Sequence, residues 1–340
     1  MADTSRHLTS FKVENFKRFE LFEMNDLGQF NLIVGDNNVG KTSVLEALLV
    51  DEDADVTIHN LLTALAYRNL ITGGLTFKEI LLYSNVKRKD FFRIIHTLKD
   101  NENTPINFIS VGSQRNKLEF YSSRQNTPAQ KFGLNDGFVP NSNIDIPFIP
   151  FHRGHDEDLT RFYGELQADR PLKSRFLKSL QIIVPTIDDI ELTLIYEKPH
   201  IIVYQSHIDQ SLPLAFFGDG LLKLFRLLAA IIINKGHRLM IDEIDTGIHY
   251  SRFKEFWKTL LIAAIDNDVQ LFMTTHNEEC IKYFVEVFNE EELLNHKEDA
   301  RSITLIESPD ETKSVKAFTY NYDGLRANLV MENEIRGGSR

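Results

Sequence analysis

The chain has 340 residues, of which 42% are hydrophobic and 26% charged, so it can bury a substantial core. Its net charge of −11, from 49 acidic and 38 basic side chains, argues against a surface that coats nucleic acid without specificity. A single cysteine, Cys280, excludes a disulfide framework and a cysteine-based zinc site. The N-terminus has no apolar signal core, and the apolar stretch Leu221–Ile233 is short and interrupted by Lys223 and Arg226. We therefore expect a cytoplasmic protein with no membrane contact.

The start of the chain predicts a hairpin, a buried strand and a helix in succession. Phe11–Phe22 interleaves aromatic and β-branched residues with charge, which is typical of an antiparallel hairpin. Phe30–Val34 is a compact apolar run that ends in glycine, as a buried strand would. Apolar residues then recur at helical spacing over Lys41–Val50. The pattern predicts a strand, a glycine-containing loop and a helix.

Residues 52–143 have a less regular pattern, and we expect them to form an accessory lobe inserted into one larger domain. The pattern predicts, in order, helices at Leu61–Leu70, Phe77–Leu82 and Asp90–Leu98, a hairpin of Ile106–Val111 with Leu118–Ser122, and an exposed loop over Ser122–Asn143.

The second half of the chain alternates strands and helices, which predicts a mostly parallel sheet covered by helices. Residues 152–186 are expected to form a helical lobe, with two amphipathic helices in Leu159–Leu180 broken near Pro171. The other elements are expected in this order: strand Ile144–Phe151, hairpin Ile187–Tyr196 with His200–Gln205, helix Leu221–Ile233, strand Arg238–Ile241, helix Arg252–Ile265, strand Val269–Thr274 and helix Glu278–Phe288. Residues 333–340 are expected to be a flexible tail.

The glycine-containing loop matches the P-loop pattern G-x-x-x-x-G-K-[ST] in full. In such a loop the backbone N–H groups point inward at a polyphosphate, and the following helix directs its positive dipole end at the same phosphates. Lys41 would reach the β- and γ-phosphates of ATP, and the Thr42 hydroxyl would bind Mg²⁺. The residues expected to bind ATP here are Gly35, Asp36, Asn37, Asn38, Val39, Gly40, Lys41, Thr42 and Ser43.

Two later apolar strands also end in polar residues. Leu239–Ile241 is followed by Asp242, expected to hold Mg²⁺, and by Glu243, expected to act as the base for an attacking water. Leu271–Thr275 is followed by His276, which we expect to donate to the γ-phosphate. Ligands bind at the carboxyl edge of open α/β sheets, so we expect these groups and the P-loop to form one site, with Lys41, Glu243 and His276 as its catalytic residues.

A second glycine-containing helix start lies at Gly218, Asp219 and Gly220. Its N–H groups could bind a phosphate. Because it precedes the Asp242–Glu243 strand, it is better placed to cap a nucleotide held by another subunit. The alternative is a simple turn at the start of a helix.

The order of these motifs resembles that of ABC ATPases, and within them the RecF-like and OLD-like branch (overcoming lysogenization defect), often described as AAA-family ATP-binding proteins. The resemblance is carried by the opening Phe11–Phe19, the pair Asn37-Asn38, the Gly218–Gly220 signature and the ending at Tyr322–Gly324. It implies an α/β fold in which residues 1–340 form a single ABC-type ATPase head. Such a head has a mostly parallel helix-covered sheet, an antiparallel β subdomain and a helical signature lobe.

The resemblance also implies a head-to-tail homodimer that sandwiches two ATP molecules and reopens on hydrolysis. Gly218–Gly220 would contact the partner's γ-phosphate, Asp245 would cross the dimer interface, and His276 would be the switch histidine. The chain departs from the family at the signature, where Phe217–Gly220 replaces Leu-Ser-Gly-Gly and offers no serine hydroxyl. It also shows no lid glutamine near His152.

Three interpretations of what the ATPase cycle serves are compatible with the sequence. The leading one is an ATP switch that controls a separately encoded effector, such as a Toprim or other nuclease, in bacterial anti-phage defence, because no heptads and no trailing nuclease pattern are present. The second is a RecF-like DNA-repair ATPase. Its DNA contacts would come from Lys87, Arg88, Lys89, Arg93, Arg115 and Lys117, although a solvated charged helix face is the better explanation of these residues in an acidic protein. The third is a nucleotide-dependent scaffold without turnover, which Glu243 disfavours and the altered signature favours.

Overall fold

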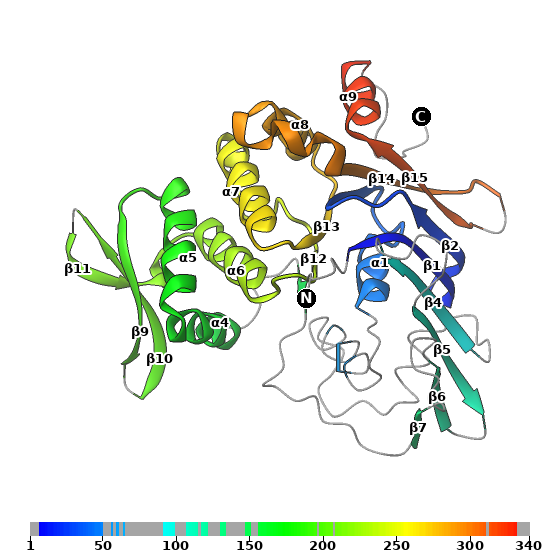
Figure 1. The fold of residues 1–340 in the computed structure, drawn as a ribbon, viewed down its shortest axis with the longest axis horizontal. Helices are drawn as coiled ribbons and strands as arrows, with labels where there is room; N and C mark the ends of the chain where they lie inside the picture. The colour runs from blue at the N-terminus through cyan, green and yellow to red at the C-terminus, as the bar shows by residue number, and fades with distance from the viewer. Residues whose placement is uncertain are drawn as a thin grey trace, which may run out of the picture.

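The computed structural model describes residues 7–49, 56, 59, 60, 64, 91–98, 107–114, 117–121, 130–133, 147–150, 156–195, 197–206, 208–310 and 313–331. Figure 1 shows three regions side by side: a central sheet with helices against it, an antiparallel sheet that begins at the N-terminus, and a helical lobe that carries a small sheet at the opposite end.

The central sheet has six strands in the order β15-β14-β3-β13-β12-β8, and every neighbouring pair is parallel except β14 with β15. Its strands are β3 (Phe30–Gly35), β8 (Phe148–Ile149), β12 (Arg238–Ile241), β13 (Gln270–Thr275), β14 (Ala300–Glu307) and β15 (Val315–Asn321). The prediction of a mostly parallel sheet is confirmed. Of the strand predicted at Ile144–Phe151, only β8 is a strand among the described residues, and the pattern gave no prediction for β14 or β15.

Both faces of this sheet are buried apart from the edge strand β15, because side chains along the other strands alternate between two hydrophobic cores. Along β3, Phe30, Leu32 and Val34 enter one core and Ile33 enters the other. The packing helices are α1 (Lys41–Leu48), α6 (Asp219–Ile233), α7 (Phe253–Asp266), α8 (Glu278–Glu286) and α9 (Tyr322–Val330). The bounds of α1, α6, α7 and α8 confirm the helices predicted from the sequence pattern, whereas α9 was not among those predictions. No helix in the described ranges is both long and apolar enough to cross a membrane.

The antiparallel sheet has the order β2-β1-β4-β5-β6-β7. Its strands are β1 (Leu8–Phe16), β2 (Phe19–Asn25), β4 (Phe91–Leu98), β5 (Asn107–Gln114), β6 (Lys117–Tyr121) and β7 (Gln130–Gly133). The two predicted hairpins are confirmed as β1–β2 and β5–β6. The described strands of residues 52–143 therefore extend the sheet that the N-terminal hairpin starts (Figure 1).

Two predictions in this region are wrong. Asp90–Leu98 was expected to be helical, but Phe91–Leu98 is β4, which pairs with β1 so that Val13 lies opposite Ile94. Its aromatic and β-branched residues suit a strand, and this pairing buries Ile94 to 1% exposure, so tertiary pairing overrides the local spacing. Within the loop expected at Ser122–Asn143, residues 130–133 form β7. The helices predicted at 61–70 and 77–82 lie outside the described residues, except for residue 64.

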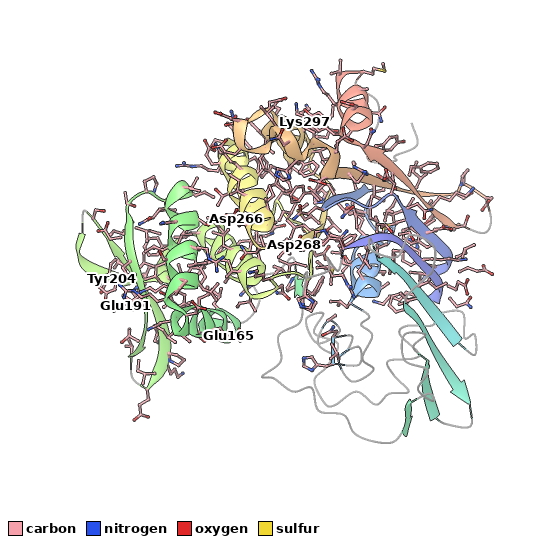
Figure 2. The ribbon with its side chains drawn as sticks, viewed as in Figure 1. Glu165, Glu191, Tyr204, Asp266, Asp268 and Lys297 are labelled. Atoms are coloured by element: carbon pink, nitrogen blue, oxygen red, sulfur yellow. The ribbon has the colours of Figure 1, made fainter. Side chains whose placement is uncertain are left out.

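The helical lobe consists of α4 (Asp156–Ala168), α5 (Arg170–Ile183) and a three-stranded sheet in the order β11-β10-β9. The strands are β9 (Ile187–Ile195), β10 (Lys198–Gln205) and β11 (Ile208–Pro213), which confirms the predicted hairpin and adds a strand to it. The predicted break between the helices is also confirmed. Asp169 caps α5 by accepting from the Leu172 N–H at 3.1 Å, and Pro171 lies in the first turn. On the small sheet the Tyr204 hydroxyl donates to Glu191 at 2.9 Å (Figure 2).

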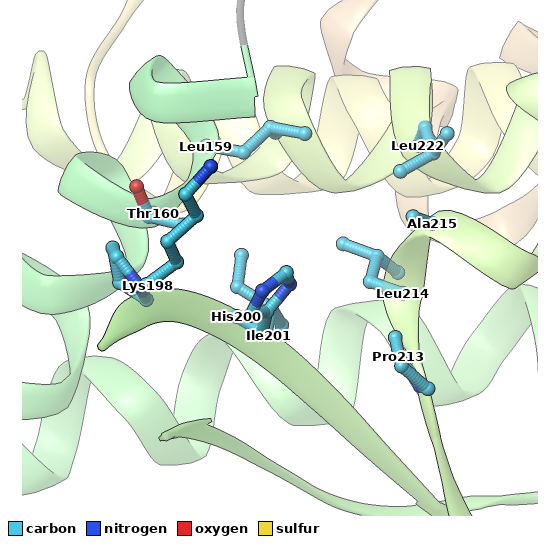
Figure 3. Close-up of a pocket in the computed structure, with 10 residues that line it drawn as sticks. Leu159, Thr160, Lys198, His200, Ile201, Pro213, Leu214, Ala215 and Leu222 are labelled. Atoms are coloured by element: carbon cyan, nitrogen blue, oxygen red, sulfur yellow. The ribbon is translucent and has the colours of Figure 1, made fainter. Parts of the chain in front are cut away.

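A cavity of about 440 Å³ lies in this lobe, between α4, β10 and the segment that leads into α6 (Figure 3). Its walls are mostly apolar, and Thr160, Lys198 and His200 supply its polar side chains. Leu214, Ala215 and Leu222 line its other end, so the cavity borders both flanks of the Gly218–Gly220 segment.

Candidate functional site

The loop between β3 and α1 has the backbone that a P-loop requires. Gly40 has a φ of +109°, and a Cβ there would lie 2.9 Å from Arg18 Cδ and 3.0 Å from Phe19 Cζ. Asn38 also has a positive φ, of 66°. Arg18 donates to the Asn38 carbonyl and pairs with Glu307, which ties the loop to the β1–β2 turn and to β14. The neighbouring elements therefore fix the loop, and glycine is needed at position 40 on both conformational and steric grounds.

The ammonium group of Lys41 lies over this loop. Its Nζ donates to the carbonyl of Gly35 at 2.7 Å and to that of Asp36 at 3.0 Å. Burial lowers the pKa of Lys41, against the opposing effect of the nearby carboxylates of Asp242, Glu243 and Asp36. Lys41 is thus a partly desolvated cation at the loop centre, as the attraction of a polyphosphate requires.

Thr42 and Asp242 are 200 residues apart in the sequence, and the fold brings them into contact. The Thr42 hydroxyl donates to Asp242 Oδ2 at 3.0 Å, and the hydroxyl of Thr274 donates to Asp242 Oδ1 at 2.7 Å. Asp242 is 3% exposed, so both carboxylate oxygens are fixed. A hydroxyl and a carboxylate are hard oxygen ligands, and Mg²⁺ is usually bound by one or two such groups together with phosphates and waters. The described residues contain no group of three or more His, Cys, Asp or Glu placed to hold a metal by themselves.

Glu243 follows directly, at the carboxyl end of β12. Its φ is +44°, its N–H donates to the Thr274 hydroxyl at 2.8 Å, and its Oε2 accepts from the Thr246 hydroxyl at 3.3 Å. Asp245 accepts from the Thr275 hydroxyl at 2.6 Å. Asp245, which the family resemblance assigns to a dimer interface, therefore has a hydrogen-bond partner within this chain.

His276 is exposed and immediately follows β13. Because β3, β13 and β12 are adjacent and parallel, the P-loop, His276 and the Asp242–Glu243 pair all lie at the same edge of the central sheet. The sequence predicted this convergence from three separate strand ends.

The Gly218–Gly220 segment joins this edge through the loop that follows Glu243. A Cβ on Gly220 would lie 2.8 Å from the Gly247 carbonyl oxygen, so glycine permits this close approach. Gly218 is the N-cap of α6, is exposed, and has open space where a Cβ would stand. The inner glycine thus serves packing within the chain, and the outer one faces solvent.

The sequence did not predict five residues that hold groups of the site: Arg18, Lys223, Thr246, Thr274 and Thr275. Lys223 donates to the Glu243 carbonyl, and the signal for it was a charged residue inside the largely apolar helix α6, a signal that it shares with Arg226. The residues considered for DNA contact cannot be placed: positions 87–89 and 115 lie outside the described residues, as do the side chains of residues 93 and 117. His152, near which the lid glutamine was expected, also lies outside them.

Comparison with solved structures shows which fold surrounds this site. The chain is similar to an SmcHead bound to the C-winged helix domain of ScpA, with a TM-score of 0.55, 12% identity and coverage of 96% of this chain and 99% of that one. It is also similar to the SMC head domain from Thermotoga maritima, with a TM-score of 0.51, 12% identity and coverage of 93% and 99%. The fold is therefore the α/β fold of ABC-type ATPase heads.

Comparison at the sequence level adds a relative and a family. A Helicobacter pylori protein named "ATP/GTP phosphatase" is 24% identical over 350 aligned residues, covering 84% of this chain and 89% of that protein. The family model described as "AAA domain, putative AbiEii toxin, Type IV TA system" matches residues 66–282, which include Gly218–Gly220, Asp242, Glu243 and His276. With the P-loop at the same sheet edge as these residues, the chain is a P-loop ATPase and belongs to this AAA-domain family.

Proposed function

We propose that this ATPase is a molecular switch. It binds Mg-ATP at the P-loop, pairs head to tail with a second copy through Gly218–Gly220, and reopens when the ATP is hydrolysed. Through this cycle it controls a separately encoded effector, such as a Toprim or other nuclease, in bacterial anti-phage defence.

The chemistry follows from the groups at the sheet edge. The P-loop N–H groups and Lys41 bind the phosphates, and Thr42 and Asp242 offer two fixed oxygens for Mg²⁺. When bound there, Mg²⁺ neutralises charge on the β- and γ-phosphates. Glu243 accepts a proton from the attacking water, and the Thr246 hydroxyl on its Oε2 orients the carboxylate. The exposed His276 donates to the γ-phosphate.

The observation that carries the dimer is the open N-terminus of α6. Gly218 caps this helix without any side-chain hydrogen bond, and Gly218 and Asp219 are exposed. The α6 start therefore presents backbone N–H groups and the positive end of a helix dipole to solvent, which suits a phosphate brought by another molecule. The chain's own P-loop already directs a different helix, α1, at its own nucleotide.

The effector is supported by the family description. It names a toxin of a TA system, which fits a protein whose activity is matched to a separately encoded partner. The resemblance of the motifs to the RecF-like and OLD-like branch favours defence as the setting.

Light scattering on the ATP-trapped protein tests the dimer. Glu243→Gln should slow hydrolysis and leave Asp242 free to hold Mg²⁺, so this variant should shift from monomer to dimer on addition of Mg-ATP. Adding Gly218→Glu should abolish the shift, because the new carboxylate repels a phosphate while its Cβ meets nothing inside the chain. Lys235→Glu, an exposed substitution near the far end of α6, is the matched control and should dimerise normally. A dimer that forms equally with Gly218→Glu would contradict the sandwich.

Affinity purification tests the output. The tagged Glu243→Gln protein is isolated with Mg-ATP from its native cells, and Lys41→Ala is isolated in parallel as the control that cannot hold ATP. A stoichiometric nuclease retained only by the first variant supports the effector switch. DNA alone would replace it with the repair interpretation, and no retained molecule would contradict effector control.

A further inference from the structure

The backbone of Glu243 adopts a conformation that few residues other than glycine tolerate. Its φ of +44° lies in the left-handed region, which carries a strain on the order of 1 kcal/mol or more for a residue with a long side chain. Such a conformation persists only where neighbouring groups determine it. At Glu243 this strain falls on the residue whose carboxylate must face the attacking water.

Both backbone polar groups of Glu243 have side-chain partners. Its N–H donates to the Thr274 hydroxyl at 2.8 Å, and its carbonyl accepts from Lys223 Nζ. The same carbonyl also accepts from the Thr246 N–H at 3.1 Å, so both of its lone pairs are used. Thr274 lies on β13 and also donates to Asp242, and Thr246 lies in the loop that follows Glu243. Lys223 is the partner that comes from a helix, α6.

Lys223 comes from α6, the helix that begins with the Gly218–Gly220 segment. It is charged in a helix whose neighbouring residues are almost all buried and apolar. Burial lowers its pKa to about 8, against the opposing effect of Asp245, Glu243, Cys280 and Asp242. The ammonium form thus persists at neutral pH, at a place where a lysine needs a reason to be kept.

The loop between these two partners is short and closely packed. Gly247 contacts Gly220 at the start of α6, and Asp245 accepts from Thr275. A movement of the α6 N-terminus would therefore reach Glu243 both through this loop and through Lys223.

We propose that Lys223 is a positioning residue for ATP hydrolysis, which holds the Glu243 carbonyl and so aims the Glu243 carboxylate while linking that aim to the signature segment at the start of α6. The proposal rests on the function of Glu243 as the base, stated above. Lys223 touches neither phosphate nor water in this scheme, and it acts only through Glu243.

The first test separates turnover from binding. Lys223→Met keeps the length of the side chain and removes the ammonium group, so it should lower kcat by about 10- to 100-fold, the range expected when a catalytic group is misplaced. The Kd for a fluorescent ATP analogue should stay at the wild-type value. Lys223→Arg should recover most of the rate, because it restores a cationic donor. Lys258→Met is the control. Lys258 on α7 is also partly buried, but it pairs with Glu290 and Glu292 in the segment that follows α8, so its loss should leave kcat unchanged.

The decisive test is a double-mutant cycle with Glu243→Gln. If Lys223 acts through Glu243, Lys223→Met should lower single-turnover hydrolysis in the wild-type background and cause no further loss beside Glu243→Gln. An equal fold-loss in both backgrounds, or an unchanged kcat in the single variant, would overturn the proposal. If Glu243→Gln alone hydrolyses ATP at the wild-type rate, the assignment of Glu243 as base is overturned and the inference fails with it. If Glu243→Gln hydrolyses ATP slowly and the effects of the two substitutions are fully additive, the proposal for Lys223 is overturned while the assignment of Glu243 as base stands.

Discussion

At the scale of single residues, Gly40 and Gly218 differ in whether the backbone and the surrounding space require a glycine. Gly40 has a positive φ, and a Cβ there would press on Arg18 and Phe19, whereas Gly218 has a negative φ and open space around it. Gly40→Ala should therefore lower the free energy of unfolding by about 1–3 kcal/mol and weaken ATP binding, because the P-loop backbone must distort. Gly218→Ala should leave stability unchanged. Denaturant titration of both variants measures the difference, and equal stabilities would contradict this account of the P-loop.

At the residue level, the sequence alone can suggest a site only where its residues are neighbours along the chain. The P-loop and the Asp242–Glu243 pair are each contiguous, so their spacing was enough to propose them. Lys223 and Thr274 act on Glu243 across sequence gaps of 20 and 31 residues, and such contacts depend on how α6 and β13 pack. Arg18 reaches the P-loop in the same way, from a turn that the sequence predicted only as part of a hairpin.

At the scale of elements, the residue that caps the N-terminus of α8 lies next to His276 of the site. Asn277 caps this helix, accepting from the N–H groups of Glu279 at 3.0 Å and Cys280 at 3.2 Å, and it directly follows His276. Asn277→Ala should cost about 1 kcal/mol of unfolding free energy and lower kcat, because the backbone that carries His276 loses its anchor. Asn25→Ala, which removes only an exposed contact with Glu23, is the control and should stay within about 0.5 kcal/mol of wild type. A lower free energy of unfolding with an unchanged kcat would contradict the claim that the Asn277 cap positions His276 for hydrolysis.

Element prediction succeeded where local pattern and tertiary context agree. The alternating strands and helices from Leu221 to Phe288 are all present, because each is long, apolar and bounded by turn residues. The wrong prediction at Phe91–Leu98 arose where spacing suggested a helix but β1 offered an unpaired edge. β14 and β15 were not predicted, although β14 is paired to β3 from Ala300 to Leu305. The sequence pattern alone cannot predict this pairing, because β3 and β14 are far apart in the chain.

At the scale of the whole molecule, α6 connects parts that are otherwise distant. It begins at the open Gly218, places Lys223 under Glu243, and continues into the core with Phe225 packed on Phe176 of α5, ring centroids 4.7 Å apart. The cavity of the helical lobe borders the same helix at Leu222. One helix thus spans the proposed dimer contact, the turn at Glu243 and the lobe, which is the arrangement that the proposed ATP switch needs in order to convert a change at the site into movement of the lobe.

Because Lys223 is a charged residue in a largely buried helix, removing its charge is expected to stabilise the folded molecule. The pKa of Lys223 falls from 10.5 to about 8 on folding, because burial outweighs the attraction of Asp245, Glu243, Cys280 and Asp242. Between about pH 8 and 10.5 the unfolded chain therefore binds more protons at this lysine than the folded chain does, and this group's contribution to stability rises with pH across that window. Below pH 8 both states are protonated, and the buried charge destabilises the fold by at most on the order of 3 kcal/mol.

Lys223→Met removes this buried charge, so at pH 7 the variant should be more stable than the wild type even though it hydrolyses ATP more slowly. Its advantage should shrink as the pH rises from 8 towards 10.5, where the wild-type lysine is neutral when folded. Urea titrations of both proteins at pH 7, 8, 9 and 10 measure the difference directly, and all other titrating groups cancel in it. A variant that is less stable at every pH would mean that the hydrogen bond to Glu243 outweighs desolvation, and Lys223 would then be a structural lysine. A stability difference that narrows as the pH rises would show instead that the fold keeps a destabilising charge beside Glu243, the proposed catalytic base.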